Sequence, residues 1–138
     1  MPDPWRAVSQ PSATSWALRD PSAHADRLAS VRAAAGPALV LNARVDVFLA
    51  GGTVDDAISR GRLYREAGAD CVYPIFARPE RLRELADGIG APINALHLPD
   101  SPSPVRLGEL GAARITFGGG LHDRIAAAVR ALAAEIAS

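Results

Sequence analysis

Four short apolar segments, each followed by a turn and a helical pattern, constrain the fold of this chain most. After each of them, apolar residues recur every three or four positions, and no hairpin-type turn joins two of them directly. Strands that alternate with helices form parallel sheets with right-handed crossovers. The sequence therefore predicts an α/β fold with four parallel strands, each followed by a helix. The predicted strands are residues 38–47, 70–76, 92–98 and 113–118.

Capping signals mark where the helices begin. Asp20 followed by Pro21 is typical of a helix start, so one helix precedes the first strand. Thr53 with Asp56 three residues later resembles a capping box. Gly61 lies inside the helix that follows and indicates close packing on a neighbouring element. The last helix carries an apolar stripe formed by Leu121, Ile125, Val129, Leu132 and Ile136.

The first predicted strand carries a polar face near its end. Asn42, Arg44 and Asp46 alternate with apolar residues, so they share one side of the strand. The preceding residues 37–41 are continuously apolar, which predicts cover on both faces there. An unpaired buried arginine is costly, so Arg44 needs Asp46, a ligand anion or water as its partner. Both an anion-binding site and a structural ion pair fit this pattern.

Composition argues against several classes of function. The formal net charge is zero and no basic run occurs, which disfavours nucleic-acid binding. The single cysteine, Cys71, cannot form an internal disulfide, as expected in a reducing compartment. No segment approaches the roughly 20 apolar residues of a membrane span, and no secretory signal is evident. We expect a cytoplasmic protein without membrane contact, with residues 1–19 poorly ordered and one domain over residues 20–138.

The order of elements leaves two arrangements open. One is an open, doubly wound sheet, and the other is part of a (β/α)8 barrel. A complete barrel takes about 250 residues. This chain has 138 residues, so the barrel alternative predicts about half of one.

Several motifs together resemble one enzyme superfamily. They are "LNARVDVFL" from residue 41, "AISRGRLYREAGADCVYPIF" from 57, "PINAL" from 92 and "LGELGAARITFGGGLHDRIAAAVRAL" from 107. This set resembles the C-terminal half of the isocitrate lyase/phosphoenolpyruvate mutase superfamily, especially its phosphoenolpyruvate-mutase-like branch, over about residues 20–137. The resemblance implies half of a (β/α)8 TIM barrel, with residues 38–47 as its fifth strand and 113–118 as its eighth. It also implies relatives that use Mg2+ to make or break a C–C or C–P bond next to a 2-oxo acid or enolate.

The same resemblance assigns substrate-binding residues. Arg44 matches the family arginine that binds the carboxylate or phosphonate of a small substrate, a task that suits a planar guanidinium. Asn42 and Asp46 would line the barrel mouth, with Asp46 orienting Arg44. Asn94, in "PINAL", would hydrogen-bond the substrate or a residue that contacts it. The alternative for Asn94 is a side chain satisfied by the backbone.

Two departures from the family leave catalysis open. Mg2+ is expected for the family, but its carboxylate ligands lie on strands two to four, which have no counterpart in this chain. The sequence therefore predicts no metal site here. In addition, Pro74 is followed by Ile75, where several C–C lyases of the superfamily carry a glutamate. No catalytic residue is assigned.

Three consecutive glycines offer another candidate site. Gly118, Gly119 and Gly120 precede the last helix, where backbone N–H groups favour anions. The alternative is a tight turn between strand and helix.

Two functional hypotheses follow. In the first, the chain supplies the substrate-anion site of a Mg2+-dependent lyase or mutase that another polypeptide completes. In the second, the chain is a truncated, non-catalytic half-barrel module that retains weak carboxylate or phosphate binding. A half barrel has unpaired edges, so we expect a homo-oligomer or a complementary N-terminal half as partner.

Overall fold

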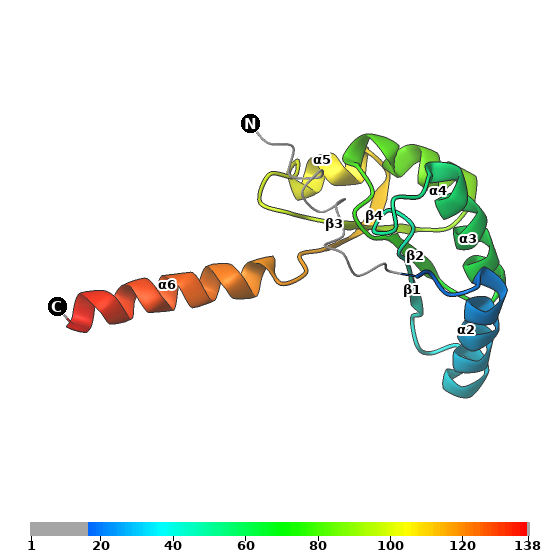
Figure 1. Cartoon of the computed structure of the whole chain (residues 1–138), viewed down its shortest axis with the longest axis horizontal. Helices are drawn as coiled ribbons and strands as arrows, with labels where there is room; N and C mark the ends of the chain where they lie inside the picture. Colours follow the sequence, from blue (N-terminus) through cyan, green and yellow to red (C-terminus); the bar gives the residue numbers. More distant parts are fainter. Residues whose placement is uncertain (1–16, 138) are drawn as a thin grey trace.

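A single four-stranded parallel sheet forms the centre of the protein. The computed structural model describes residues 17–137, and residues 1–16 of the segment 1–19 that was expected to be poorly ordered lie outside this range. The strands are β1 (Asn42–Val45), β2 (Cys71–Pro74), β3 (Ile93–Leu96) and β4 (Ala112–Thr116), and they lie side by side in sequence order (Figure 1). The predicted parallel sheet is confirmed.

Helices alternate with these strands as predicted. A 3-10 turn (Pro79–Arg81) leads into the helix that follows the second strand. The helices are α2 (Pro21–Ala35), α3 (Val54–Glu66), α4 (Leu82–Ile89), α5 (Pro104–Glu109) and α6 (Gly120–Ala137).

The predicted caps are present at the starts of α2 and α3. Asp20 accepts a hydrogen bond from the backbone N–H of Ala23 at 2.9 Å. Thr53 and Asp56 form a complete capping box: the Thr53 hydroxyl oxygen accepts from the Asp56 N–H at 3.2 Å, and the Asp56 carboxylate accepts from the Thr53 N–H at 2.9 Å. The bond from the Thr53 N–H lowers the pKa of the Asp56 carboxyl. Local sequence thus fixes where both helices begin.

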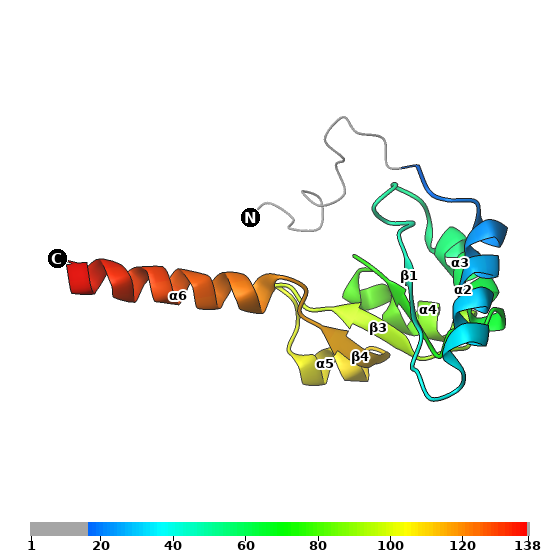
Figure 2. The ribbon, with the colours of Figure 1, turned by 90° about the horizontal axis from the view of Figure 1, so that it is seen from below.

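The order of the strands decides between the two arrangements. A doubly wound sheet reverses its strand order and carries helices on both faces, whereas a barrel segment keeps sequence order with helices outside. Here the order is β1-β2-β3-β4, and α2, α3 and α4 lie on one side of the sheet (Figure 2). Side chains that face these helices form the core. The sheet contributes Ala43, Val45, Val72, Ile93 and Ala95, the turn after β1 contributes Val47, and the helices contribute Leu28, Ala57, Tyr64, Leu82, Leu85, Ile89 and Leu107.

The first strand is shorter than predicted. The expectation that the apolar residues 37–41 are covered on both faces is wrong, because residues 37–39 form a turn and bend, and Leu39 and Val40 are 52% and 64% exposed. Arg32 of α2 holds this segment away from the sheet by donating to the carbonyl oxygens of Gly36 at 2.8 Å and Leu39 at 2.7 Å. Tertiary hydrogen bonds here override the apolar pattern.

The last helix projects from the body of the protein (Figures 1 and 2). Helix α6 forms where the periodicity predicts it, but none of its residues is buried. Its apolar stripe is exposed, with Ile125 at 65% and Val129 at 59%. Between residues 17 and 137, no helix is long and apolar enough to cross a membrane.

Gly61 brings α3 and α4 into contact, as the sequence predicts. A Cβ atom at this position would lie 2.5 Å from Cδ1 and 2.7 Å from Cγ1 of Ile89, whose side chain is fully buried. The absence of a side chain at residue 61 therefore allows the two helices to pack closely.

Substitution of Gly61 by alanine should destabilise the protein. The gain in helix propensity is about 1 kcal/mol, but overpacking against Ile89 costs about 1–3 kcal/mol. Gly108→Ala in α5 is the matched control, because nothing lies within 4 Å of its added Cβ. Urea unfolding should show a loss of stability only for Gly61→Ala. Equal stability of the two variants would contradict the close packing.

Candidate anion-binding site

The polar side chains of the strands gather on the face of the sheet that the helices leave uncovered. Arg44 of β1 is paired with Tyr73 of β2, and Asn94 of β3 with Arg114 of β4. Paired residues of neighbouring strands point to the same side. This uncovered face, which we call the inner face, corresponds to the interior of a barrel.

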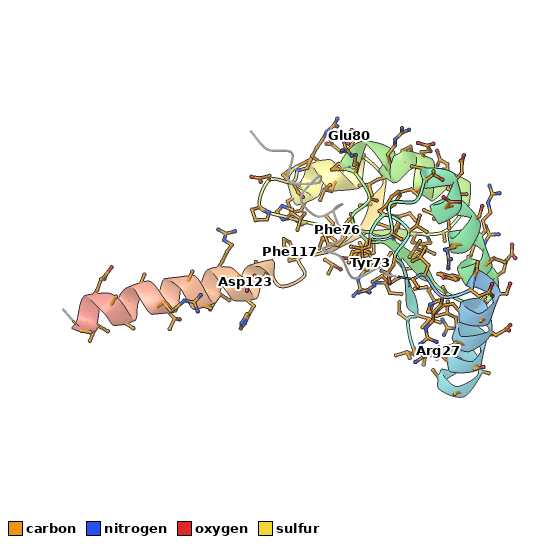
Figure 3. All side chains as sticks on the ribbon, viewed as in Figure 1. Arg27, Tyr73, Phe76, Glu80, Phe117 and Asp123 are labelled. Carbon is orange, nitrogen blue, oxygen red and sulfur yellow. The ribbon has the colours of Figure 1, made fainter. Side chains whose placement is uncertain are left out.

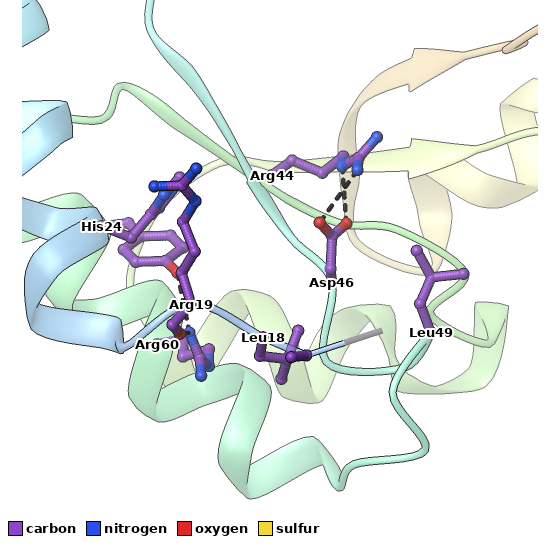
Figure 4. A pocket seen from close by; sticks show the side chains of 9 residues that line it. Leu18, Arg19, His24, Arg44, Asp46, Leu49 and Arg60 are labelled. Carbon is purple, nitrogen blue, oxygen red and sulfur yellow. Dashed lines mark hydrogen bonds and ion pairs between the residues drawn. The ribbon is translucent and has the colours of Figure 1, made fainter. Parts of the chain in front are cut away.

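Arg44 and Asp46 form an ion pair at one end of this face (Figure 4). The Arg44 Nε atom lies 2.7 Å from Asp46 Oδ1, and Nη2 donates to Asp46 Oδ2 at 3.0 Å. The side chains are 52% and 35% exposed. Arg44 Nη1 has no hydrogen-bond or ion-pair partner within residues 17–137. Asp46 therefore orients one edge of the guanidinium and leaves the other available.

Two oxygen acceptors, one in this pair and one next to it, lack part of their hydrogen bonding. The Oδ1 atoms of Asn42 and Asp46 are both buried and accept no aligned hydrogen bond from the described residues. The Arg44 Nε atom is therefore in close charge contact with Asp46 Oδ1, but the geometry of this contact is poor for a hydrogen bond. Buried acceptors of this kind are normally paired, so Asn42 has capacity for one further donor.

Tyr73, Cys71 and Arg114 share the inner face with these residues but were not assigned from the sequence. Burial raises the pKa of the Tyr73 phenol, while nearby Arg44 opposes the shift. Burial likewise raises the pKa of the Cys71 thiol, and Arg114 opposes it. Strand alternation alone could have placed Tyr73 and Arg114 on this face, once the register between strands was known.

Asn94 lies on the inner face, and its side chain is hydrogen-bonded to a residue of the neighbouring strand. It is 1% exposed, and its amide nitrogen donates to the Thr116 hydroxyl at 2.9 Å. The Thr116 hydroxyl in turn donates to Asn94 Oδ1 at 3.0 Å. The partner of Asn94 is therefore a side chain of β4 and not the backbone.

Gly118 and Gly119 form the turn between β4 and α6, Gly120 is the first residue of α6, and Gly118 has φ of 53°. They line a largely apolar cavity of about 570 Å3, together with Tyr73, Phe76 and Phe117, where α6 leaves the body (Figure 3). The Asp123 carboxylate lies in the first turn of α6. A carboxylate at this position already occupies the electrostatically favourable place at the helix start.

Phe76 has an unusual backbone conformation at the end of β2. Its φ is 61°, which costs a bulky residue free energy. The strain is located at the edge of the cavity, at the same end of the sheet as the glycine turn.

The described residues do not fit a Mg2+ site. In the part of the chain from residue 17 to 137, no group of three or more His, Cys, Asp or Glu side chains is placed to hold a metal ion. Mg2+ requires several oxygen ligands at near-octahedral positions. We therefore derive no chemical step through a metal on these residues.

Comparison with known proteins places this geometry in a family. The sequence profile described as phosphoenolpyruvate phosphomutase matches residues 9–137, nearly the whole chain. The chain belongs to this family, within the phosphoenolpyruvate mutase/isocitrate lyase superfamily. The resemblance found in the sequence is confirmed.

Solved structures support the same assignment. A protein from Burkholderia cenocepacia J2315 assigned as a phosphonomutase aligns with a TM-score of 0.79 and 29% identity, over 90% of this chain and 56% of its own. A 2,3-dimethylmalate lyase aligns with a TM-score of 0.67 and 27% identity, over 83% and 44%. A phosphonopyruvate hydrolase in complex with oxalate and Mg2+ shares the fold, with a TM-score of 0.68 and 24% identity, over 91% and 47%.

The chain spans about half the length of these structures. Its fold is therefore half of the TIM barrel of this superfamily, as predicted. A search of curated proteins gave no significant match.

Two substitutions separate a binding role of Arg44 from a structural one. Arg44→Ala should change the free energy of unfolding by less than about 1 kcal/mol, because exposed ion pairs contribute little. Asn94→Ala should cost about 1–3 kcal/mol, because it removes buried hydrogen bonds to Thr116. Urea unfolding of both variants provides the measurement. A larger loss for Arg44→Ala than for Asn94→Ala would support the structural ion pair instead.

Proposed function

We propose that this chain provides the substrate-anion side of an active site that makes or breaks a C–C or C–P bond next to a 2-oxo acid or enolate. Membership of the family supports the reaction class. The main observation behind this proposal is the placement of Arg44. Its half-exposed guanidinium lies on the inner face and keeps one edge available. A second polypeptide would contribute the Mg2+ ligands, for which the described residues offer no counterpart.

The role of Arg44 follows from its geometry. A guanidinium can donate two parallel hydrogen bonds to one carboxylate or phosphonate, and it stays protonated at all relevant pH values. Asp46 holds the Nε and Nη2 atoms, so the edge that contains Nη1 can bind the ligand. Asn42 can accept a hydrogen bond from the ligand or from a bound water through its Oδ1 atom.

Asn94 and the glycine turn receive smaller roles in this proposal. The Asn94 amide is committed to Thr116, so it acts by positioning β3 against β4 beneath the ligand. We assign no substrate group to Gly118–Gly120, because Asp123 already places a negative charge at the start of α6.

A non-catalytic half-barrel module is the second candidate. The observation that favours it is the absence of a potential metal-binding cluster among residues 17–137. In this case, Arg44 would retain weak binding of a carboxylate or phosphate without chemistry. We propose the cytoplasm as the location in both cases, because the buried thiol of Cys71 is free.

Oxalate is a suitable probe of the anion site, because the related phosphonopyruvate hydrolase binds it. Calorimetric titration should show oxalate binding to the wild-type chain and none to Arg44→Ala. Arg44→Lys should bind more weakly than wild type, since lysine cannot form the two parallel hydrogen bonds. Arg130→Gln in α6 controls for the loss of one positive charge. Equal binding by wild type and Arg44→Ala would refute the proposal.

The exposed stripe of α6 supports self-association. Most of the stability of a helix in a protein comes from packing of its apolar face, so α6 needs a partner for its apolar side chains. The apolar cavity beside Phe76 and Phe117 offers further uncovered surface. We propose that a second copy of the chain covers these surfaces, with a complementary N-terminal half as the alternative.

Light scattering tests this oligomeric state. The wild-type chain should have the mass of a dimer or a larger assembly, and Ile125→Glu should reduce it, because the substitution places a charge on the apolar stripe. Ala134→Glu adds the same charge on the opposite side of α6 and should leave the mass unchanged. A wild-type monomer would exclude self-association and favour a complementary polypeptide.

A further inference from the structure

A second group of basic side chains lies beside the free edge of β1. Together with the Arg44–Asp46 pair, it encloses a cavity of about 220 Å3 (Figure 4). Arg19 precedes α2, His24 lies in the first turn of α2, and Arg60 belongs to α3. Segments distant in the sequence thus bring three basic side chains to the same cavity.

The charges in this cavity do not balance. Asp46 is its only carboxylate among the described residues, and it is already paired with Arg44. The Arg19 guanidinium has no hydrogen-bond or ion-pair partner in the described part of the chain. Arg60 is fixed in place, because it donates to the Arg19 carbonyl oxygen at 2.9 Å and to the Tyr64 hydroxyl at 3.3 Å. Arg19 and Arg60 therefore have no counter-ion among the described residues that line the cavity, although Asp56 of α3 lies near Arg60 outside it.

His24 adds a titratable group to this cavity. Its ring packs against Tyr64 with the ring centroids 4.8 Å apart. Burial lowers the pKa of His24, and Arg19, Arg27 and Arg60 lower it further, while Asp46 opposes them. This environment therefore favours the neutral imidazole, whereas an anion that enters the cavity would favour the protonated form.

We infer that this cavity binds a small dianionic oxyacid, with Arg19 and Arg60 supplying the positive charge that the Arg44–Asp46 pair lacks and His24 becoming protonated when the anion binds. The inference rests on the proposed function, because Arg44 belongs to both. It extends the site from one guanidinium to a cluster on β1, α2, α3 and the segment before α2. One charged pair alone attracts a dianion weakly, whereas two further guanidinium groups make the cavity electropositive.

The test uses oxalate and the complete chain in buffer free of phosphate and carboxylates. Arg19→Gln should weaken oxalate binding about fivefold or more, the order expected for one charge-assisted hydrogen bond. Arg130→Gln, with the same change in net charge outside the cavity, should bind as the wild type does. Arg19 has no described side-chain partner, so its substitution should leave the fold intact.

The NMR titration of the histidine ring protons gives a second, independent readout. Saturating oxalate should raise the pKa of His24, whereas the ring-proton chemical shifts of His97 and His122 should not respond to oxalate, because those two histidines lie outside the cavity. By linkage, oxalate affinity should then increase as the pH falls from 8 to 6, and His24→Gln should abolish this increase.

The outcomes distinguish this inference from the proposed function. If Arg44→Ala abolishes oxalate binding while Arg19→Gln binds like Arg130→Gln and the His24 pKa does not move, the cavity is not part of the site and this inference alone fails. If the wild-type chain binds no oxalate, both fail. Weaker binding by Arg19→Gln together with a raised His24 pKa would establish the cluster.

Discussion

The structure depends on a parallel sheet that is covered by helices on one face only. Burial of Val45, Val72 and Ile93 against the helices stabilises the sheet, as expected when apolar surface leaves water. The opposite face carries Arg44, Asp46, Tyr73 and Arg114, which in a closed barrel would point to the interior. Among residues 17–137, β1 is the end strand of the sheet and has a free edge, and no residue of α6 is buried.

Much of this fold could be predicted from local signals. The capping box at Thr53, the Asp20-Pro21 start and the glycine at residue 61 act through neighbours in sequence or through steric limits, so they appear in the structure as expected. Leu39 and Val40 could not be placed correctly, because their position depends on hydrogen bonds from Arg32, which no periodicity encodes. The exposure of α6 was also beyond prediction, since an apolar stripe does not specify which surface covers it.

The candidate site was predicted in part. Strand alternation places Asn42 and Arg44 of β1 on one face, and the Arg44–Asp46 contact is present. Asn94 and Thr116 are 22 residues apart in the sequence. Their hydrogen bond depends on the register between β3 and β4, which the sequence leaves open. Arg19, His24 and Arg60 meet only through the packing of α2 on α3 and of α3 on β1, so no motif identifies them as a cluster.

The central claim is that the inner face binds a small anion through Arg44. A crystal structure of the chain with bound oxalate tests it most directly. The account predicts one oxalate carboxylate within hydrogen-bond distance of Arg44 Nη1, with the Arg44–Asp46 pair intact. Oxalate bound at the glycine turn before α6, or an inner face without oxalate at saturating concentration, would contradict it.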